Sequence, residues 1–136
     1  MAQIVGSGDY GYVLFGGGLR GFGIGAGLAA RLGPKVSVVI PAYNQAQYLG
    51  DAIDSVLSQT VMDYEIIVVN DGSTDETAEI AASYGNRLRY VYQENRGLAG
   101  ARNTGILTAR GEFIGLLDSD DLWLPGYLET MLHLSE

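Results

Sequence analysis

Apolar residues after position 34 follow two patterns that alternate along the chain. Three short runs rich in Val, Ile and Leu are too short for helices and are typical of buried strands, and a fourth run, at residues 88–92, alternates and is expected nearer an edge of the sheet. The segments between them carry apolar residues at the spacing of one helix face. The strands are predicted at residues 35–40, 64–69, 88–92 and 112–117. The helices are predicted at residues 46–59, 75–84, 98–109 and 125–135.

Turn residues indicate where the predicted helices begin and end. Ser73 or Thr74 is a candidate N-cap of the second helix, and Gly85 suits the position just after its last turn. Pro125 suits the first turn of the last helix. Gly105, inside the third helix, is expected to weaken it.

Strands that alternate with helices predict an α/β fold. We expect a Rossmann-like parallel sheet with right-handed crossovers, helices on both faces and strand order 3-2-1-4, counting strands from residue 35. The carboxyl ends of parallel strands meet at one edge, and ligands bind there. Residues 41–44, 70–73 and 118–121 follow the first, second and fourth strands, so we expect them to converge.

Residues 1–34 differ from the rest, since they hold 11 of the 20 glycines. Tyr10–Phe15 could form a strand, and we expect the remainder to be a Gly-rich extension that is partly disordered or paired with a partner. Gly21, Gly23 and Ala26 match a dinucleotide-binding pattern, but neither the preceding strand nor the acidic residue about 20 positions on is present. The uncharged stretch is also too short for a transmembrane segment.

The 136 residues allow one domain, with 35–136 as its folded part. A net charge of −8 makes nucleic acid an unfavourable partner. The chain has no cysteine, which excludes disulfides and thiolate metal sites. Its one histidine, His133, is expected at the surface or the edge of the core.

Three carboxylates follow the last predicted strand within four residues. Asp118, Asp120 and Asp121 would repel one another unless a cation lay among them. Carboxylate oxygens suit Mg²⁺ or Mn²⁺, and Mg²⁺ usually reaches a protein together with phosphates. The alternative is an Asx-rich turn that caps the next helix.

The other strand exits carry further candidate ligands. Tyr43 could stack on a planar base or be a half-buried loop residue, and Pro41 could simply end its strand. Asp71 could accept a hydrogen bond from a base N–H, or belong to an ordinary turn. Arg102 could bind phosphate or lie at the solvated surface.

Three more side chains near this edge are open to more than one interpretation. Arg96 has the same two alternatives as Arg102, and Asn103 could line the cleft or pack on its helix. Trp123 is expected to be a packing anchor rather than a platform for a sugar.

Residues 35–129 resemble the N-terminal half of the family 2 inverting nucleotide-sugar glycosyltransferases. The stretches that carry the resemblance are VSVVIPAYN at 36–44, SVLSQT at 55–60, EIIVVNDGSTD at 65–75, NRGLAGARN at 95–103, GEFI at 111–114 and DSDD at 118–121. Their order along the chain makes the match specific, whereas the D-x-D pattern of the last stretch alone would be weak.

The resemblance implies a glycosyltransferase A fold and a nucleotide diphosphate sugar as donor, most often a UDP-sugar. It implies that Pro41, Tyr43, Asp71, Arg102, Asp118 and Asp120 bind the donor. Tyr43 would stack on the base and Asp71 would bond its N–H. Asp118 and Asp120 match the D-x-D pair, and Asp120 or Asp121 would hold Mg²⁺ or Mn²⁺ bridging the diphosphate.

The resemblance also implies that the acceptor site and the catalytic base follow the acidic motif. We therefore expect residues 1–136 to be the truncated, donor-binding portion of a metal-dependent enzyme that transfers a sugar with inversion, too short to be active alone. The alternative is a non-catalytic assembly protein that uses the Gly-rich segment. An exposed sheet edge or the Gly-rich N-terminus would favour self-association. A cytoplasmic location is expected, because nucleotide sugars are found there.

Overall fold

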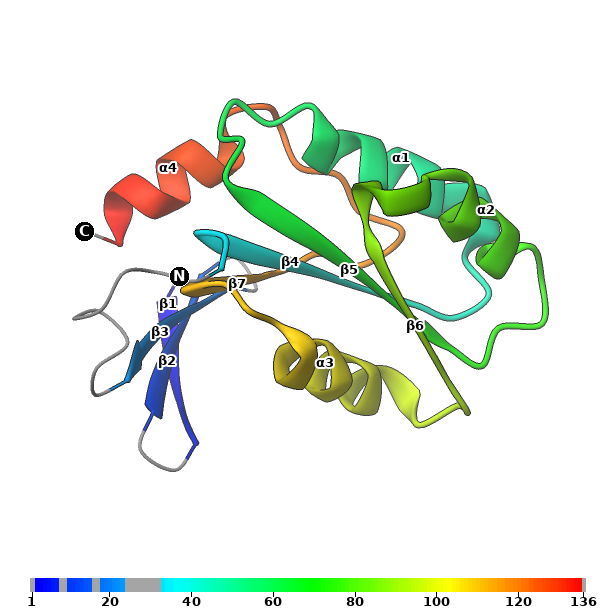
Figure 1. The fold of residues 1–136 in the computed structure, drawn as a ribbon, viewed down its shortest axis with the longest axis horizontal. Helices are drawn as coiled ribbons and strands as arrows, with labels where there is room; N and C mark the ends of the chain where they lie inside the picture. Colours follow the sequence, from blue (N-terminus) through cyan, green and yellow to red (C-terminus); the bar gives the residue numbers. More distant parts are fainter. Residues whose placement is uncertain (1, 8–9, 16–17, 24–32, 136) are drawn as a thin grey trace.

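The computed structural model describes residues 2–7, 10–15, 18–23 and 33–135 (Figure 1). Within these residues seven strands form one sheet in the order β1-β2-β3-β7-β4-β5-β6. The strands are β1 Ala2–Ser7, β2 Tyr10–Phe15, β3 Gly18–Gly23, β4 Val36–Ala42, β5 Tyr64–Asp71, β6 Arg89–Gln93 and β7 Phe113–Leu116. The helices are α1 Ala46–Leu57, α2 Thr77–Ser83, the 3₁₀ turn η1 Gly85–Arg87, α3 Gly97–Thr108 and α4 Tyr127–Leu134.

Strands β6, β5, β4 and β7 are mutually parallel neighbours. This arrangement confirms the predicted order 3-2-1-4 for the strands after residue 35. Helices α1, α2 and α4 lie on one side of these strands and α3 lies on the other (Figure 1). The carboxyl ends of the four strands consequently point to one end of the sheet.

Alternate residues of each central strand enter two separate cores. Val38 and Ile40 pack in the core beneath α1, α2 and α4, whereas Val39 packs with Ala101 of α3. All three strand residues are fully buried. Because both faces of the sheet are covered, β4 reads as a continuous apolar run rather than an alternating one.

The N-terminal strands extend this sheet beyond β7. Strand β3 pairs antiparallel with β7, from Gly18 opposite Gly115 to Arg20 opposite Phe113, and β1 and β2 continue the sheet outward. The strand expected at Tyr10–Phe15 is confirmed as β2. Strand β7 is therefore not an edge of the sheet, because β3 of the same chain pairs with it. The glycine alternation beyond Gly23, including Ala26, lies outside the described residues.

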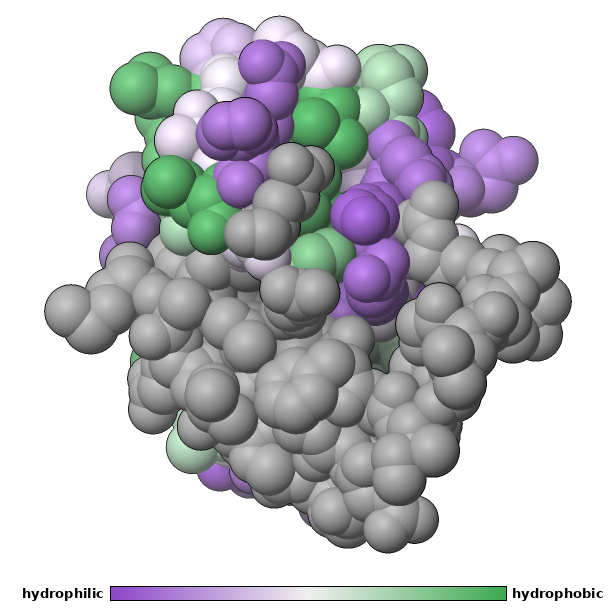
Figure 2. All heavy atoms as spheres, turned by 90° about the vertical axis from the view of Figure 1, so that its left-hand side faces the viewer, coloured by the Kyte–Doolittle hydropathy of each residue, from purple (hydrophilic) through white to green (hydrophobic). Residues whose placement is uncertain are grey.

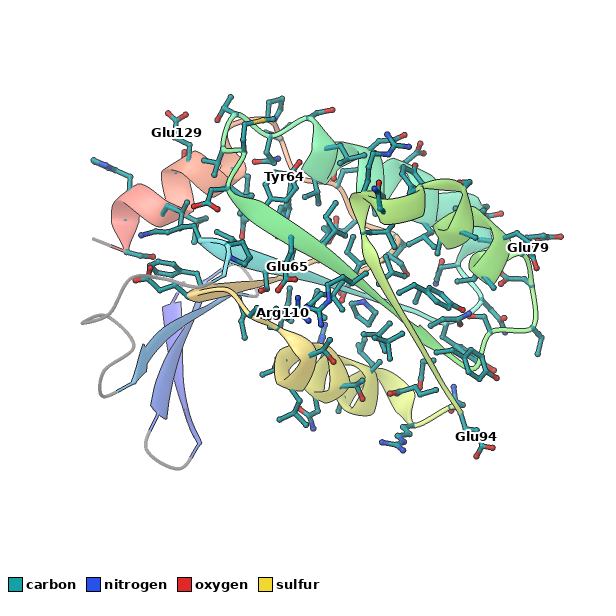
Figure 3. All side chains as sticks on the ribbon, in the orientation of Figure 1. Tyr64, Glu65, Glu79, Glu94, Arg110 and Glu129 are labelled. Carbon is teal, nitrogen blue, oxygen red and sulfur yellow. The ribbon has the colours of Figure 1, made fainter. Side chains whose placement is uncertain are left out.

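A polar network joins strands at the amino ends of the parallel sheet. The Glu65 carboxylate accepts hydrogen bonds from Ser37 Oγ at 2.6 Å, Arg89 Nη1 at 2.7 Å and the Arg110 backbone N–H at 2.8 Å. Figure 3 shows Glu65 and Arg110 close together where α3 returns to the sheet. Burial opposes ionisation of Glu65, but the bonds from Ser37, Arg89 and Arg110 hold its pKa below the ordinary value.

Helix α4 is the last helix of the described residues and lies on the same side of the sheet as α1 (Figure 1). Leu128 is fully buried, whereas Leu134 remains mostly exposed. Figure 2, viewed from the end of the molecule where α4 lies in Figure 1, shows hydrophobic and hydrophilic side chains interspersed there. The helix begins at Tyr127 rather than at the predicted Pro125.

Candidate functional site

The three predicted strand exits converge on one cavity of about 330 Å³. This volume is at the lower end of the range for small-molecule sites. The cavity lies at the carboxyl ends of the parallel strands, as open α/β sheets favour. Its lining residues are Pro41, Ala42, Tyr43, Gln45, Asp71, Asn95, Gly97, Leu98, Ala101, Asp118, Ser119 and Asp120.

Asp71 is the buried carboxylate of the cavity, with 1% of its surface exposed. Its Oδ1 accepts hydrogen bonds from Gln93 Nε2 and from the Arg96 backbone N–H, both at 2.8 Å. Its Oδ2 has one longer contact, with Asn95 Nδ2 at 3.3 Å. The carboxylate is therefore fixed from one side, and Oδ2 keeps unused acceptor capacity.

The loops that present Tyr43 and Asp71 are interlocked. The Asn44 backbone N–H donates to Ser73 Oγ at 2.9 Å, and Asn44 Oδ1 accepts from the Thr74 N–H at 2.8 Å. Asn44 has a φ of 51°, a left-handed conformation that asparagine tolerates better than most residues. Ser73 thus bridges two loops, and neither Ser73 nor Thr74 caps α2, contrary to our prediction, because the N-cap position is Glu76.

Asp75 ties the first turns of α1 and α2 together. Its Oδ2 accepts from the Ala46 N–H and its Oδ1 from the Thr77 N–H, both at 3.0 Å. Burial opposes its ionisation, but hydrogen bonds from Thr77 and Ala46 hold the pKa of Asp75 below the ordinary value. Helix α2 consequently begins at Thr77, two residues later than predicted.

Within the acidic loop, Asp118 forms an ion pair with a cationic side chain, whereas Asp120 is exposed at the cavity wall. Asp118 Oδ1 accepts from Arg102 Nη2 at 2.9 Å, which forms an ion pair between the loop and α3. The Asp121 backbone N–H donates to the Asp118 carbonyl at 3.0 Å, so the loop is also a turn. Asp120 is exposed and lines the cavity, whereas Asp121 is exposed outside the lining.

The ion pair leaves part of Arg102 without a partner. Its Nε is buried and makes no hydrogen bond. The Nε–H therefore has no acceptor among the residues that the structure describes, and Arg102 itself is not among the residues that line the cavity. In the described part of the chain, no three Asp, Glu, His or Cys side chains form a ready-made metal site.

Of the remaining candidate residues, Tyr43 and Pro41 line the cavity, whereas Arg96, Asn103 and His133 do not. Tyr43 is half-exposed at the cavity wall beside the buried Pro41. Arg96 contributes its backbone N–H to Asp71 while its side chain is exposed, and Asn103 is exposed outside the lining. His133 is exposed on α4, as expected.

Trp123 is a packing anchor, as predicted. It is 9% exposed and stacks on Tyr127 with ring centroids 4.5 Å apart. Gln93 and Asn95, which hold Asp71 in place, were not among the predicted site residues. Gln93 ends β6, so its position at a strand exit was the available signal.

Comparison with known proteins places the chain among enzymes of one class. A glycosyltransferase of Rickettsia typhi is 48% identical over 101 residues, which cover 74% of this chain and 32% of that protein. The structure of S. aureus TarS 1–349 in complex with UDP-GlcNAc matches with a TM-score of 0.66 and 31% identity, over 73% of this chain and 30% of that one. The mannosyltransferase PcManGT from Pyrobaculum calidifontis, in complex with GDP-Man and Mn²⁺, matches with a TM-score of 0.58 and 32% identity, over 67% and 29%.

The parallel sheet and these neighbours define a glycosyltransferase domain of the A fold, as the resemblance implied. Residues 37–136 match the Glycosyl transferase family 2, and the chain belongs to that family. The aligned part covers 32% of the Rickettsia typhi protein and 30% of the TarS chain, and a smaller share of several other relatives. Within the described residues, none of the helices has the length and apolar character needed to cross a membrane.

Proposed function

We propose that residues 35–136 form the donor-binding half of a metal-dependent glycosyltransferase that uses a UDP-sugar and inverts the transferred sugar. The observation that carries this proposal is the single cavity that joins Tyr43, Asp71 and Asp120. These residues lie up to 77 positions apart and supply an aromatic ring, a buried acceptor and an exposed carboxylate. The UDP-GlcNAc bound to TarS and the GDP-Man bound to PcManGT support a nucleotide diphosphate sugar as the donor.

The base would bind between the first two strand exits. The exposed ring of Tyr43 offers a stacking face, which contributes on the order of 1–3 kcal/mol per base in single-stranded nucleic-acid complexes. Asp71 Oδ2 would accept the base N–H, since Oδ1 already has two donors. Pro41 forms the buried floor beside Tyr43.

The diphosphate would bind toward the acidic loop. Mg²⁺ and Mn²⁺ sites built on phosphates use only one or two carboxylates, with phosphate and water oxygens completing the shell. Asp120 lines the cavity and Asp121 is its neighbour, so this donor set fits a cation that arrives with the diphosphate. Such a cation would neutralise the charge that develops on the departing diphosphate.

Arg102 would assist at the same end. Arg102 does not line the cavity, but its ion pair with Asp118, which does, holds the guanidinium next to it. The acceptor site and the catalytic base are not assigned to these residues, because the aligned part of the chain covers 32% of the Rickettsia typhi protein. A cytoplasmic location follows from the proposed donor.

Calorimetric titration of the full chain with UDP, with and without Mn²⁺, tests the proposal. We expect binding that strengthens when Mn²⁺ is present. Asp120→Ala should abolish the Mn²⁺-dependent gain while leaving the circular dichroism spectrum unchanged. Asp51→Ala, which removes an exposed carboxylate of α1 outside the cavity, is the matched control and should bind as the unmodified protein does. A folded protein that binds no UDP under either condition would overturn the proposal.

A further inference from the structure

Hydrogen bonds leave Asp71 with only one oxygen for a ligand. Oδ1 accepts two short bonds, from Gln93 Nε2 and the Arg96 N–H, which use both of its lone pairs. Oδ2 has a single 3.3 Å contact with Asn95 Nδ2. A ligand in the cavity therefore meets a carboxylate that can accept from one N–H rather than from two side by side.

The orientation of the Gln93 amide is set by its two neighbours. A carboxylate only accepts hydrogen bonds, so the Gln93 nitrogen must face Asp71 and its Oε1 must face away. Thr104 Oγ1 lies 2.5 Å from that Oε1 and donates to it. Its contact with the Gly100 carbonyl is longer, at 3.1 Å. Thr104 of α3 thus locks Gln93 at the end of β6, and Gln93 locks Asp71 at the end of β5.

The hydrogen-bonded chain from Thr104 through Gln93 to Asp71, called the relay below, is shielded from water at Gln93 and Asp71. Asp71 is 1% and Gln93 9% exposed. Gly72, next to Asp71, has a φ of 80°, and a Cβ there would lie 2.8 Å from the Asn95 backbone nitrogen. The loops after β5 and β6 are therefore packed against each other, which leaves the carboxylate little room to rotate.

We infer that Gln93 and Thr104 are positioning residues that make Asp71 selective for uracil over guanine; this inference rests on the proposed function. Uracil presents one N–H between two carbonyls, which suits a single free carboxylate oxygen. Guanine presents two adjacent N–H groups, which pair with both oxygens of a carboxylate. Its second N–H would meet the saturated Oδ1 and lose its hydrogen bond, and buried polar groups left unpaired are a strong source of discrimination.

Competitive calorimetry of the full chain with UDP, GDP and N3-methyl-UDP in Mn²⁺ tests the inference without any substitution. We expect UDP to bind about 10- to 100-fold more tightly than either analogue, as expected for one hydrogen bond to a charged group. N3-methyl-UDP keeps the ring and the diphosphate but lacks the N–H. Equal binding of UDP and GDP would overturn the inference while leaving the donor site intact.

Substitutions in the relay provide the second readout, the ratio of UDP to GDP affinity. Gln93→Met removes the amide at similar size, frees one of the two lone pairs of Oδ1, the other still accepting the Arg96 N–H, and should lower the ratio about tenfold. Thr104→Val removes the hydroxyl and should lower the ratio several-fold, whereas Thr104→Ser keeps the hydroxyl and should restore it. General loss of stability would weaken both nucleotides together and leave the ratio unchanged.

The outcomes separate the two proposals. Tight binding of UDP with the same ratio in Thr104→Val, Thr104→Ser and the unmodified chain would refute the relay but support the donor site. Failure of the folded chain to bind any of the three nucleotides would refute both.

Discussion

Gly105→Ala tests how α3 is seated on the sheet. A Cβ at this position would lie 2.2 Å from Val39 Cγ1 and 3.0 Å from Val39 Cγ2. Carbon atoms in contact are normally 3.5–4.0 Å apart, so helix or strand must shift. Overpacking of this kind costs about 1–3 kcal/mol. Alanine regains about 1 kcal/mol of helix propensity, so we expect a net loss of about 0–2 kcal/mol.

Equilibrium urea unfolding, followed by circular dichroism, measures this loss as a lower midpoint at an unchanged m-value. Val39→Ala alone should cost about 2 kcal/mol, because it removes two methyl groups from a fully buried site. In that background the two closest contacts are gone and the nearest remaining one, with the Cβ of residue 39 at 3.1 Å, needs only a small shift, so the second change should be close to neutral. Coupling of about 1–3 kcal/mol is therefore expected between the two changes. Strictly additive effects would refute the claim that Val39 is what requires a glycine at position 105.

Two further predictions concern the base site and the polar network. Tyr43→Ala should weaken UDP binding about 5- to 100-fold at every Mn²⁺ concentration, because it removes the stacking face. Tyr48→Ala, at an exposed tyrosine outside the cavity, should not, and equal affinity in both variants would remove stacking from the model of binding. Glu65→Gln should destabilise the protein above about pH 5, since the lowered pKa of Glu65 means that its ionised form stabilises the fold. The difference should shrink as the pH falls below the ordinary pKa of about 4.3; a pH-independent difference in thermal midpoint would contradict this assignment.

The parallel part of the sheet could be predicted because burial on both faces leaves a plain signal. The runs in β4 and β5 are continuous and apolar, and their observed bounds differ from the predicted ones by at most two residues. Strands β1 and β3 gave no such signal. Strand β3 is rich in glycine and pairs with β7, which lies more than 90 residues further along the chain, and β1 reaches the sheet only through its pairing with β2.

The candidate site was predictable to a similar degree. We could predict that Tyr43, Asp71 and Asp120 would lie close together, because each follows a parallel strand and the topology brings these strand ends to one edge. The partners of these residues were not predictable. Thr104 and Gln93 are ordinary polar residues in the sequence, and only the packing of α3 against β6 brings their side chains together. The pairing of Arg102 with Asp118 likewise depends on distance in space.

The interlocked loops of Asn44, Ser73 and Asp75 have a consequence for how a nucleotide would be received. The stacking ring and the buried acceptor are held in one rigid frame, so the cost in conformational entropy of arranging them is met when the chain folds. A ligand then loses less affinity to immobilising loops than it would at a site assembled on contact. Because these loops are hydrogen-bonded to one another, loss of the Asp75 hydrogen bonds should make the position of Tyr43 less well defined. Asp75 itself lines no part of the cavity.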